Sequence, residues 1–508
     1  FAACHNPSYV RKYNMVQELV PGGTFLLNCS WSPEELETHL PGQVKRYIAE
    51  NDIQFYTIDG IKIGKEIGLG GRINTVLQSA FFKLAAIIPE ETAIELMKAA
   101  AKATYGKKGD KIVQMNYDAI DAGATGVVKI DVPASWKDAK DESFAQTATG
   151  DRKDVVDFVN DIQIPVNAQE GNKIPVSVVK TYEHGQTPSG ASAFEKRGIA
   201  VDVPVWNSAN CIQCNQCAYV CPHATIRPFA MDEKEAANAP AATKFTAKMI
   251  GKGCEGYKFT MAISPLDCMG CGVCVGVCPT KPEKRALKMV PQESQMDQQA
   301  VFDYAVANVT KKETPFADTS IKGSQFNQPL LEFSGSCAGC AETSYARLIT
   351  QLFGERMYIS NATGCSSIWG GSAPSTPYTV NRDSGRGPAW ANSLFEDNAE
   401  HGLGIYLGQK TIREKLIGYV TELMNGENTP AEAKAAAEKF LATKDDGKAN
   451  DAATKALIAE LEKGAGKCEL CDKILAEKSY LSKKSIWIFG GDGWAYDIGF
   501  GGLDHVIA

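Results

Sequence analysis

Two runs of four cysteines are the part of this 508-residue chain best suited to do chemistry. The first run is Cys211-Ile-Gln-Cys214-Asn-Gln-Cys217-Ala-Tyr-Val-Cys221-Pro222, and the second is Cys268-Met-Gly-Cys271-Gly-Val-Cys274-Val-Gly-Val-Cys278-Pro279. Both follow the pattern C-x2-C-x2-C-x3-C-P, which is typical of chains that bind two [4Fe–4S] clusters. Such a cluster accepts one electron at a time, so the spacing predicts an electron carrier.

The fourth cysteine of each run ligates the cluster of the other run in this arrangement. We therefore expect one cluster on Cys211, Cys214, Cys217 and Cys278, and the other on Cys268, Cys271, Cys274 and Cys221. Structural zinc is the alternative, because zinc also binds C-x2-C pairs. Zinc, however, usually takes two separated pairs and gives no reason for a third cysteine and a proline in each run. The spacing therefore favours iron–sulfur clusters.

Three more cysteines follow apolar segments that we expect to be strands, at residues 330–333 and 357–360. They are the pair Cys337-Ala-Gly-Cys340 and the single Cys365. Together they make three of the four ligands of a further cluster site. A lone C-x2-C pair can also be a redox pair, a metal half-site or chance. Cys468-Glu-Leu-Cys471 is a weak candidate for the missing ligand, because it lies in a helical stretch.

The apolar strand expected at residues 485–489 runs into Gly491-Asp492-Gly493-Trp494. A thiamin diphosphate motif begins in this way, because the aspartate reaches Mg²⁺, a hard cation that binds carboxylate and phosphate oxygens. The glycines let the backbone approach the pyrophosphate closely. The alternative is an ordinary turn, in which Gly-Asp-Gly is common. The usual motif closes with an asparagine well downstream, and this sequence stops at Ala508 before that point.

The elements around these residues alternate between strands and helices in the first 200 positions. We expect strands at 23–29 and 54–58, a helix starting at Ser32 and a second helix over 89–103. This alternation predicts an α/β layer on a largely parallel sheet. Residues 141–197 are rich in Gly, Pro and Ser and are expected to be a linker. Residues 231–258 and 408–475 are expected to be helical insertions.

The bulk composition excludes some functions. The length predicts three domains, and 44% apolar with 22% charged residues is typical of a soluble protein. A net charge of −7 without a long basic run argues against nucleic acid as a partner. Polar residues interrupt the most apolar stretch, 67–89, so no membrane span is expected. Sixteen cysteines with eight in cluster spacing indicate a reducing, anoxic cytoplasm rather than a disulfide framework.

These motifs together resemble the pyruvate:ferredoxin (flavodoxin) oxidoreductases of the long, single-chain type. The resemblance extends over essentially the whole chain and includes His5-Asn6-Pro7-Ser8-Tyr9, Gly71-Arg72-Ile73-Asn74, Lys322-Gly323-Ser324-Gln325-Phe326 and Gly491-Asp492-Gly493-Trp494-Ala495-Tyr496-Asp497. It implies that the sequence, which begins with Phe1 rather than Met, is an internal portion of such a protein. The chain alone is then expected to be an incomplete enzyme.

The resemblance implies an α/β multidomain fold with three parts. Residues 1–200 would be an α/β domain, similar to the gamma part of 2-oxoacid oxidoreductases, plus a linker. Residues 201–295 would be a ferredoxin-like α+β domain with two [4Fe–4S] clusters. Residues 296–508 would be the N-terminal part of a thiamin diphosphate-binding α/β domain, with the helical insertion at about 408–475.

The resemblance also implies roles for single residues. Cys337, Cys340 and Cys365 match ligands of a third cluster near the thiamin, and Glu342 and Cys365 match residues beside that cofactor. Gly491, Asp492, Gly493 and Trp494 match the diphosphate loop, with Asp492 on Mg²⁺. Asn74 and Asn116 match coenzyme A contacts, although turn or cap asparagines are the alternative. Cys4, Cys29, Cys254, Cys468 and Cys471 match no functional position, and we expect them to be small buried apolar residues.

The implied reaction is the oxidative decarboxylation of pyruvate with coenzyme A to acetyl-CoA and CO₂. Electrons would leave singly through three [4Fe–4S] clusters to ferredoxin or flavodoxin. The full protein would be a cytoplasmic homodimer, or hydrogenosomal in an anaerobic protist, without nucleic acid or membrane partners. Two alternatives stay open: an oxidoreductase for another 2-oxoacid, and an electron-transfer module without catalysis of its own.

Overall fold

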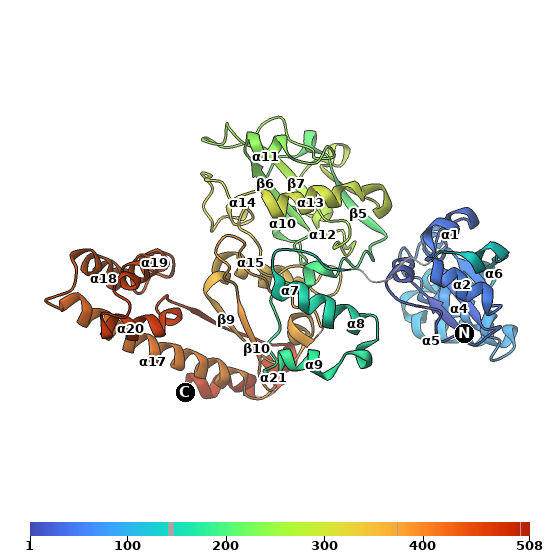
Figure 1. Ribbon diagram of the computed structural model, residues 1–508. Helices are drawn as coiled ribbons and strands as arrows, with labels where there is room; N and C mark the ends of the chain where they lie inside the picture. Colours follow the sequence, from blue (N-terminus) through green and yellow to red (C-terminus); the bar gives the residue numbers. More distant parts are fainter. Residues whose placement is uncertain (141–146, 373, 498) are drawn as a thin grey trace. The chain divides into compact units, whose positions relative to one another are not determined.

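The chain forms two compact units in a computed structural model that describes residues 1–140, 147–372, 374–497 and 499–508, without the side chains of residues 372, 492, 497, 499 and 500 (Figure 1). The first unit comprises residues 1–149 and 164–174, and the second comprises residues 150–163 and 175–508. Each unit is described by itself.

The first unit is built on a four-stranded sheet with the order β1-β2-β3-β4. Its strands are β1 (Ala2–Cys4), β2 (Thr24–Asn28), β3 (Gln54–Ile58) and β4 (Val128–Lys129). The first three strands are parallel, and β4 pairs with β3 in the antiparallel direction. Parallel strands need helical connections between them. The sheet is therefore the α/β layer that the sequence predicts.

Helices cover both faces of this sheet. Phe25 and Leu27 point to a core formed with α1 (Pro33–His39) and α2 (Gly42–Glu50). Leu26 points to the opposite core, formed with α4 (Asn74–Ala85) and α6 (Asp110–Thr125). Successive side chains of a strand face opposite sides of the sheet. The remaining helices of this part are α3 (Gly60–Ile67) and α5 (Glu90–Tyr105).

Ser32 starts α1, as predicted. Its side chain accepts a hydrogen bond from the Glu35 amide (3.2 Å), and the Glu35 carboxylate accepts one from the Ser32 amide (2.8 Å). This reciprocal pair satisfies two backbone donors that a helix start otherwise leaves unpaired. Pro33 follows at the first helical position, where its missing N–H costs nothing.

The second unit contains two antiparallel strand pairs around the cysteine runs. Strand β5 (Asp202–Trp206) pairs with β8 (Leu287–Pro291), and β6 (Ile226–Met231) pairs with β7 (Lys258–Ile263). Two short helices, α10 (Gln216–Tyr219) and α12 (Val273–Gly276), lie within the runs. Helix α13 (Asp297–Asn308) packs on β7. This repeated arrangement is the ferredoxin-like fold that the sequence predicts.

The C-terminal part has a parallel sheet with the order β10-β9-β11. Its strands are β10 (Ala389–Asn392), β9 (Met357–Asn361) and β11 (Ser485–Phe489), preceded by α15 (Ala341–Phe353). Between β10 and β11 the chain forms α17 (Asn398–Asn425), α18 (Ala431–Thr443), α19 (Gly447–Lys463) and α20 (Glu469–Ala476). Strands β9 and β11 were predicted, and so was the helical character of residues 408–475.

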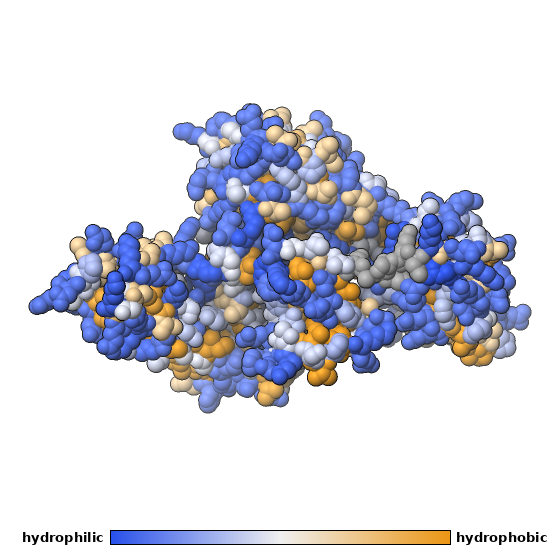
Figure 2. Space-filling view, in the orientation of Figure 1, coloured by the Kyte–Doolittle hydropathy of each residue, from blue (hydrophilic) through white to orange (hydrophobic). Residues whose placement is uncertain are grey.

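The helices of this insertion have their own apolar core, made by Leu416, Val420, Phe440, Leu457 and Leu461. Helices α18, α19 and α20 pack together along α17 (Figure 1). Hydrophilic residues cover most of the surface over α18 and α19 on the face drawn in Figure 2. The insertion is therefore stabilised by its own apolar contacts.

Three local predictions are wrong. Residues 231–258 contain only the short helix α11 (Glu233–Ala237), because Pro240 and three glycines follow it. Residues 141–197 were expected to be a linker, but they include α7 (Lys153–Phe158), α8 (Ile164–Asn167) and α9 (Val176–Val179); residues 141–146 lie outside the described part. No strand forms at residues 330–333, where a single bridge joins Leu331 to Tyr378.

No helix in the described part of the chain is both long and apolar enough to cross a bilayer.

Helices α4 and α6 approach closely at Gly123, and this contact yields a prediction. A Cβ atom there would lie 2.3 Å from the Val76 carbonyl oxygen, whereas a Cβ at Gly106 would meet nothing within 4 Å. We expect Gly123→Ala to destabilise the helix pair by about 1–3 kcal/mol and to speed amide hydrogen exchange in α4 and α6. Gly106→Ala is the control and should leave exchange unchanged. Equal exchange in the two variants would contradict the close packing.

Candidate iron–sulfur and cofactor site

Four cysteines from both runs meet at one small cavity in the second unit. They are Cys211, Cys214, Cys217 and Cys278, and apolar side chains including Trp206, Met261 and Leu287 complete the lining. The strand pairs make this possible, because β5 leads into the first run and β8 leaves the second run. The group is the same as the one that the spacing assigns to one cluster, although its ligation stays a prediction.

The other four cysteines line a second small cavity. They are Cys221, Cys268, Cys271 and Cys274, with Pro204, His223 and Ile226 among the other lining residues. Each cavity therefore receives three thiols from one run and one thiol from the other. Both offer the four thiols that a [4Fe–4S] cluster needs. Among the described residues, no group of three or more His, Cys, Asp or Glu side chains is placed to hold a single metal ion.

The backbone of both runs follows the same unusual path. Gln213 and Asn215 have φ angles of 57° and 61°, and the equivalent Gly270 and Gly272 have φ angles of 70° and 72°. This path turns the Gln213 amide to the Cys211 sulfur and the Gly270 amide to the Cys268 sulfur, at 3.4 Å in both cases. Amide donors to sulfur are one of the factors that set cluster potentials.

Hydrogen bonds compensate the strain at the two non-glycine positions, which would cost roughly 1–2 kcal/mol each. The Gln213 side chain donates to the Lys248 carbonyl (2.7 Å) and accepts from the Ile250 amide (2.8 Å). The Asn215 side chain donates to the Lys322 carbonyl (3.0 Å). The contacts of Gln213 give a structural role to the segment between the runs, for which a helix had been expected.

Burial disfavours the thiolate form of most cavity cysteines. It raises the pKa of Cys268 to about 12 and raises the pKa values of Cys217 and Cys274 strongly. Cys278 differs: burial works in the same direction, but hydrogen bonds from Thr280 and Ala286 and the nearby Arg285 charge hold its pKa below the usual value. Thiolates in such surroundings need positive charge beside them, which iron would supply.

The Cys337–Cys340 turn packs on the second cavity. A Cβ at Gly339 would lie 3.6 Å from the Cys271 Cβ and 3.6 Å from Cγ2 of Val273. The His223 Nε2 donates to the Cys337 carbonyl (3.3 Å). The Cys337–Cys340 turn is therefore in direct contact with residues around the second cavity.

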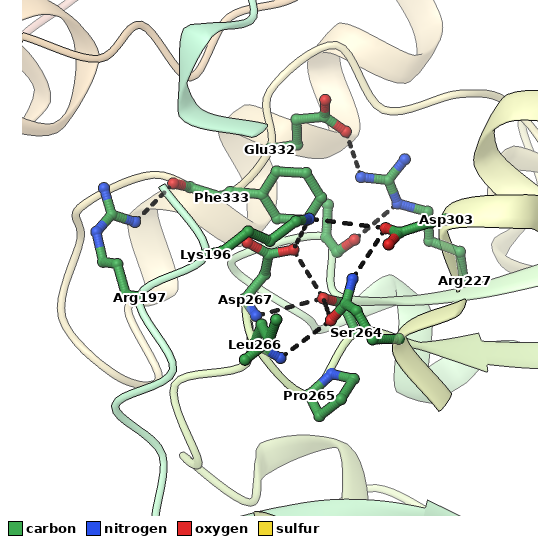
Figure 3. Close-up of polar contacts among 12 residues, drawn as sticks. Lys196, Arg197, Arg227, Ser264, Pro265, Leu266, Asp267, Asp303, Glu332 and Phe333 are labelled. Carbon is green, nitrogen blue, oxygen red and sulfur yellow. Dashed lines mark hydrogen bonds and ion pairs between the residues drawn. The ribbon is translucent and has the colours of Figure 1, made fainter. Parts of the chain in front are cut away.

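A buried polar network joins the entrance of the second run to the chain that leads to Cys337 (Figure 3). The Asp267 carboxylate, 1% exposed, accepts hydrogen bonds from Lys196 (2.6 Å) and from the Ser264 hydroxyl (2.7 Å). Lys196 also lies 5.1 Å from the centre of the Phe333 ring. Because Asp267 directly precedes Cys268, this network fixes the start of the second run.

Phe333 lies between cations on two sides. The guanidinium of Arg227 is 5.3 Å from its ring centre and forms an ion pair with Glu332 (Figure 3). Arg197 donates to the Phe333 carbonyl (2.9 Å). Cations above an aromatic face are attracted by its negative charge density. No sequence motif indicated this cluster, because its members are far apart along the chain.

The loops after β9 and β11 meet at the carboxyl edge of the C-terminal sheet. A Cβ at Gly364 would lie 3.2 Å from the backbone of Gly491, so the loop before Cys365 and the Gly491–Trp494 loop touch. Ligands of open parallel sheets bind at this edge. Trp494 donates to the Gly501 carbonyl (3.2 Å). Asp492 and Gly493 lie in α21 (Asp492–Asp497), but the Asp492 side chain is outside the described part.

Glu342 lies in the first turn of α15, and Cys340 is the residue that caps this helix. Trp369 donates to the Glu342 carboxylate (3.3 Å). Trp369 belongs to the short helical segment that follows Cys365. Cys337 and Cys365 are exposed, and the described contacts do not join Cys365 to Cys337 or Cys340. Their joint ligation stays a prediction.

Asn74 and Asn116 lie on neighbouring helices of the first unit but at different levels. Asn74 is exposed at the start of α4, whereas Asn116 is buried and donates to the Ile112 carbonyl of its own helix (2.8 Å). Ser79 donates to the Ile120 carbonyl, which shows that α4 and α6 run antiparallel with Gly123 beside Val76. At 1.5 Å per residue the two asparagines are separated by about 13 Å along the helices. Only an extended ligand could contact both.

The cysteines without an assigned role differ in their surroundings. Cys4, Cys29 and Cys254 are buried among apolar residues, as expected. Cys468 and Cys471 instead form a disulfide, with Cα atoms 5.2 Å apart. The expectation that these two are merely small buried residues is therefore wrong. Cys468 precedes α20, and its sulfur accepts from the Cys471 amide (3.1 Å), so the helix start brings the two together.

Arg347 is a buried residue that the sequence did not single out. It lies on α15 and is 1% exposed, and it donates to the backbone carbonyl of Cys221 (2.9 Å). Burial lowers its pKa to about 10, which leaves the guanidinium protonated at neutral pH. Polar residues at the buried positions of α15, including Thr343 and Gln351, are the only sequence signal of this site.

Three family models match parts of the chain. A pyruvate ferredoxin/flavodoxin oxidoreductase model matches residues 1–126, a domain of unknown function matches 146–200, and a 4Fe-4S dicluster domain matches 210–281. The dicluster match covers the ferredoxin-like fold with its two cysteine runs. These matches confirm the predicted order of an α/β part and a two-cluster part.

Curated relatives align with the entire chain. A pyruvate-flavodoxin oxidoreductase of Enterobacter agglomerans is 51% identical over 517 residues, and a pyruvate:ferredoxin oxidoreductase of Moorella thermoacetica is 50% identical over 512 residues. The chain spans 43% of the length of each. A pyruvate dehydrogenase [NADP(+)] of Cryptosporidium parvum is 41% identical over 565 residues, with 29% of its length covered. The predicted resemblance is therefore confirmed over the whole chain.

The network around Asp267 yields a prediction. We expect Lys196→Met to cost about 3 kcal/mol, because it leaves a buried carboxylate without its cation. Hydrogen exchange should quicken in the peptide that contains Ser264 and Cys268. Lys448→Met is the matched control, since Lys448 is 90% exposed and its ion pair with Asp318 should contribute at most about 1 kcal/mol. If the two variants exchange alike, the network does not hold the second run.

Proposed function

We propose that this chain, which resembles the pyruvate-flavodoxin and pyruvate:ferredoxin oxidoreductases over its whole length, carries electrons from pyruvate oxidation as part of such an enzyme. The reaction would convert pyruvate and coenzyme A to acetyl-CoA and CO₂. The observation that carries the proposal is the pair of four-cysteine cavities, the second in contact with the Cys337–Cys340 turn.

The eight cysteines of the two cavities would hold two [4Fe–4S] clusters. Cys211, Cys214, Cys217 and Cys278 would ligate one, and Cys268, Cys271, Cys274 and Cys221 would ligate the other. Bound clusters supply acceptors for single electrons. The chain holds the thiols in apolar surroundings and directs amides to two of the sulfurs. The domain boundaries at about 200 and 295 are part of the same proposal.

The carboxyl edge of the C-terminal sheet would hold thiamin diphosphate and Mg²⁺. Gly491, Gly493 and Trp494 would form the diphosphate loop, with Asp492 as the metal ligand, and Glu342 would contact the cofactor. Thiamin diphosphate supplies the electron sink for decarboxylation. The tight approach of Gly364 to Gly491 supports the proposal, because it brings Cys365 to the same edge as the loop.

Cys337, Cys340 and Cys365 would provide three ligands of a third cluster. The contact of Gly339 with Cys271 favours this assignment, since electron transfer needs short distances between its centres. Asn74 and Asn116 would contact coenzyme A, whose length fits residues that lie far apart along α4 and α6. Both assignments follow the resemblance, and the placement of these residues supports them.

Ferredoxin or flavodoxin is the proposed electron acceptor, and the proposed setting is a homodimer of the full protein in an anoxic cytoplasm. The relatives name three different acceptors: flavodoxin, ferredoxin and NADP⁺. The segment that these proteins share therefore delivers electrons, whichever acceptor receives them. In a pure electron carrier, only an external electron donor would reduce the clusters. In the proposed enzyme, pyruvate with coenzyme A should reduce them. Assays with 2-oxoglutarate in place of pyruvate test the remaining alternative.

Cys278→Ser tests the exchange of ligands between the runs. We expect loss of the cluster in the cavity of Cys211, Cys214 and Cys217, with the other cluster retained, because Cys278 lines only the first cavity. Iron content and electron paramagnetic resonance of the full enzyme measure the result. Cys254→Ser is the control, as Cys254 is buried but lines neither cavity. Loss of the cluster in the cavity of Cys268 would show that the pairing is wrong.

Asp492→Ala tests the cofactor loop. We expect the full enzyme to lose bound thiamin diphosphate and pyruvate-dependent activity, because Mg²⁺ would lose its carboxylate ligand. The clusters of the two cavities should be retained, since their cysteines lie elsewhere in the chain. Asp504→Ala, at an exposed position, is the control. Thiamin content measured after gel filtration decides the outcome, and normal content in the variant would refute the assignment.

A further inference from the structure

Arg347 is enclosed where the C-terminal part of the second unit meets the first cysteine run. Its Nε donates to the Cys221 carbonyl (2.9 Å), and its Nη2 donates to the Tyr219 carbonyl (2.6 Å). Its Nη1 donates to the side-chain oxygens of Gln325 (3.1 Å) and Gln351 (2.5 Å). All three nitrogens are thus engaged, and every one of these acceptors is neutral.

The charge of Arg347 has no carboxylate to balance it. Among the residues that the structure describes, no Asp or Glu pairs with its guanidinium, whose hydrogen bonds go to Cys221, Tyr219, Gln325 and Gln351. Arg227 is buried too, but it has Glu332 as its counter-ion (Figure 3). Burying an uncompensated charge is unfavourable. A negative charge close to Arg347 would remove this cost.

Cys221 connects Arg347 to such a charge. It gives its carbonyl to Arg347, while its thiol lines the second cavity with Cys268, Cys271 and Cys274. The four thiolates of a [4Fe–4S] cluster outweigh the positive charge of its core, and reduction adds one more negative charge. We propose that Arg347 is the counter-charge of the cluster in the second cavity and stabilises its reduced form. This inference rests on the ligand assignment proposed above.

A fixed cation in low-dielectric surroundings makes the addition of an electron more favourable, so Arg347 raises the reduction potential of this cluster. At the first cavity Arg285 donates to the Cys278 carbonyl (2.6 Å) and Lys322 is also nearby, but both cations are part-exposed and therefore more strongly screened by water. Arg347 thus acts mainly on the cluster that lies in contact with the Cys337–Cys340 turn. An electron that arrives from the Cys337–Cys340 turn therefore reaches first the cluster whose reduction potential Arg347 raises.

The test is a redox titration of the full enzyme followed by electron paramagnetic resonance. In Arg347→Gln, the midpoint potential of one cluster should become more negative, with the other clusters and the iron content unchanged. Arg347→Lys keeps the charge and should restore most of the wild-type potential. A purely structural role would be refuted by that rescue. An unchanged potential in Arg347→Gln at full iron content, or an equal shift in Arg347→Lys, would overturn the proposal.

Gln351→Glu provides an independent variant that leaves Arg347 in place. It sets a carboxylate beside Nη1 and neutralises the cation, so the same cluster should shift in the same direction even if Arg347→Gln does not fold. An unchanged potential in Gln351→Glu would also overturn the proposal. Arg382→Gln is the control, because Arg382 likewise donates to two carbonyls, of Val306 and Val309, but lies at the surface. Absence of both clusters from the wild-type enzyme would instead refute the proposed ligand assignment.

Discussion

The exchange of one cysteine between the two runs is the constraint on which the second unit depends. The first cavity is complete only with Cys278, and the second only with Cys221. Neither run can therefore shift without opening both cavities. The two antiparallel strand pairs hold the runs in this arrangement. Strand β5 precedes the first run and pairs with β8, which follows the second run. Strand β6 follows the first run and pairs with β7, which precedes the second run. The strand pairs therefore hold the eight thiols in position around the two cavities.

The sequence predicted what depends on local chemistry. Cysteine spacing grouped the thiols that line each cavity, Ser32 marked a helix start, and apolar runs located β2, β3, β9 and β11. It could not predict the contact of Arg347 with Cys221 or the pair of Arg227 and Glu332, because in both cases the two residues are more than 100 positions apart along the chain. Long-range polar contacts leave no periodic pattern in a sequence.

The failed strand at residues 330–333 shows how tertiary contacts override an apolar pattern. The Glu332 amide donates to the Pro377 carbonyl (3.0 Å), but the next amide, of Phe333, donates to the His223 carbonyl (3.0 Å). The backbone thus bonds first to the C-terminal part and then to the first cysteine run. Phe333 takes a φ of 53° to make this change, and a strand cannot continue through that conformation.

This junction has a consequence for electron transfer. The same few residues that turn the chain at Phe333 lead directly to Cys337, and the cations Lys196 and Arg227 fix the ring of Phe333. Arg347 binds the Cys221 carbonyl from the other side of the junction. A cluster on the Cys337 side and the cluster of the second cavity would therefore be held at a constant separation by buried charges. A constant separation would matter for the proposed electron transfer, because the transfer rate falls steeply with distance. The ion pairs of Lys196 with Asp267 and of Arg227 with Glu332, together with the contact of Arg347 with Cys221, would keep that separation fixed.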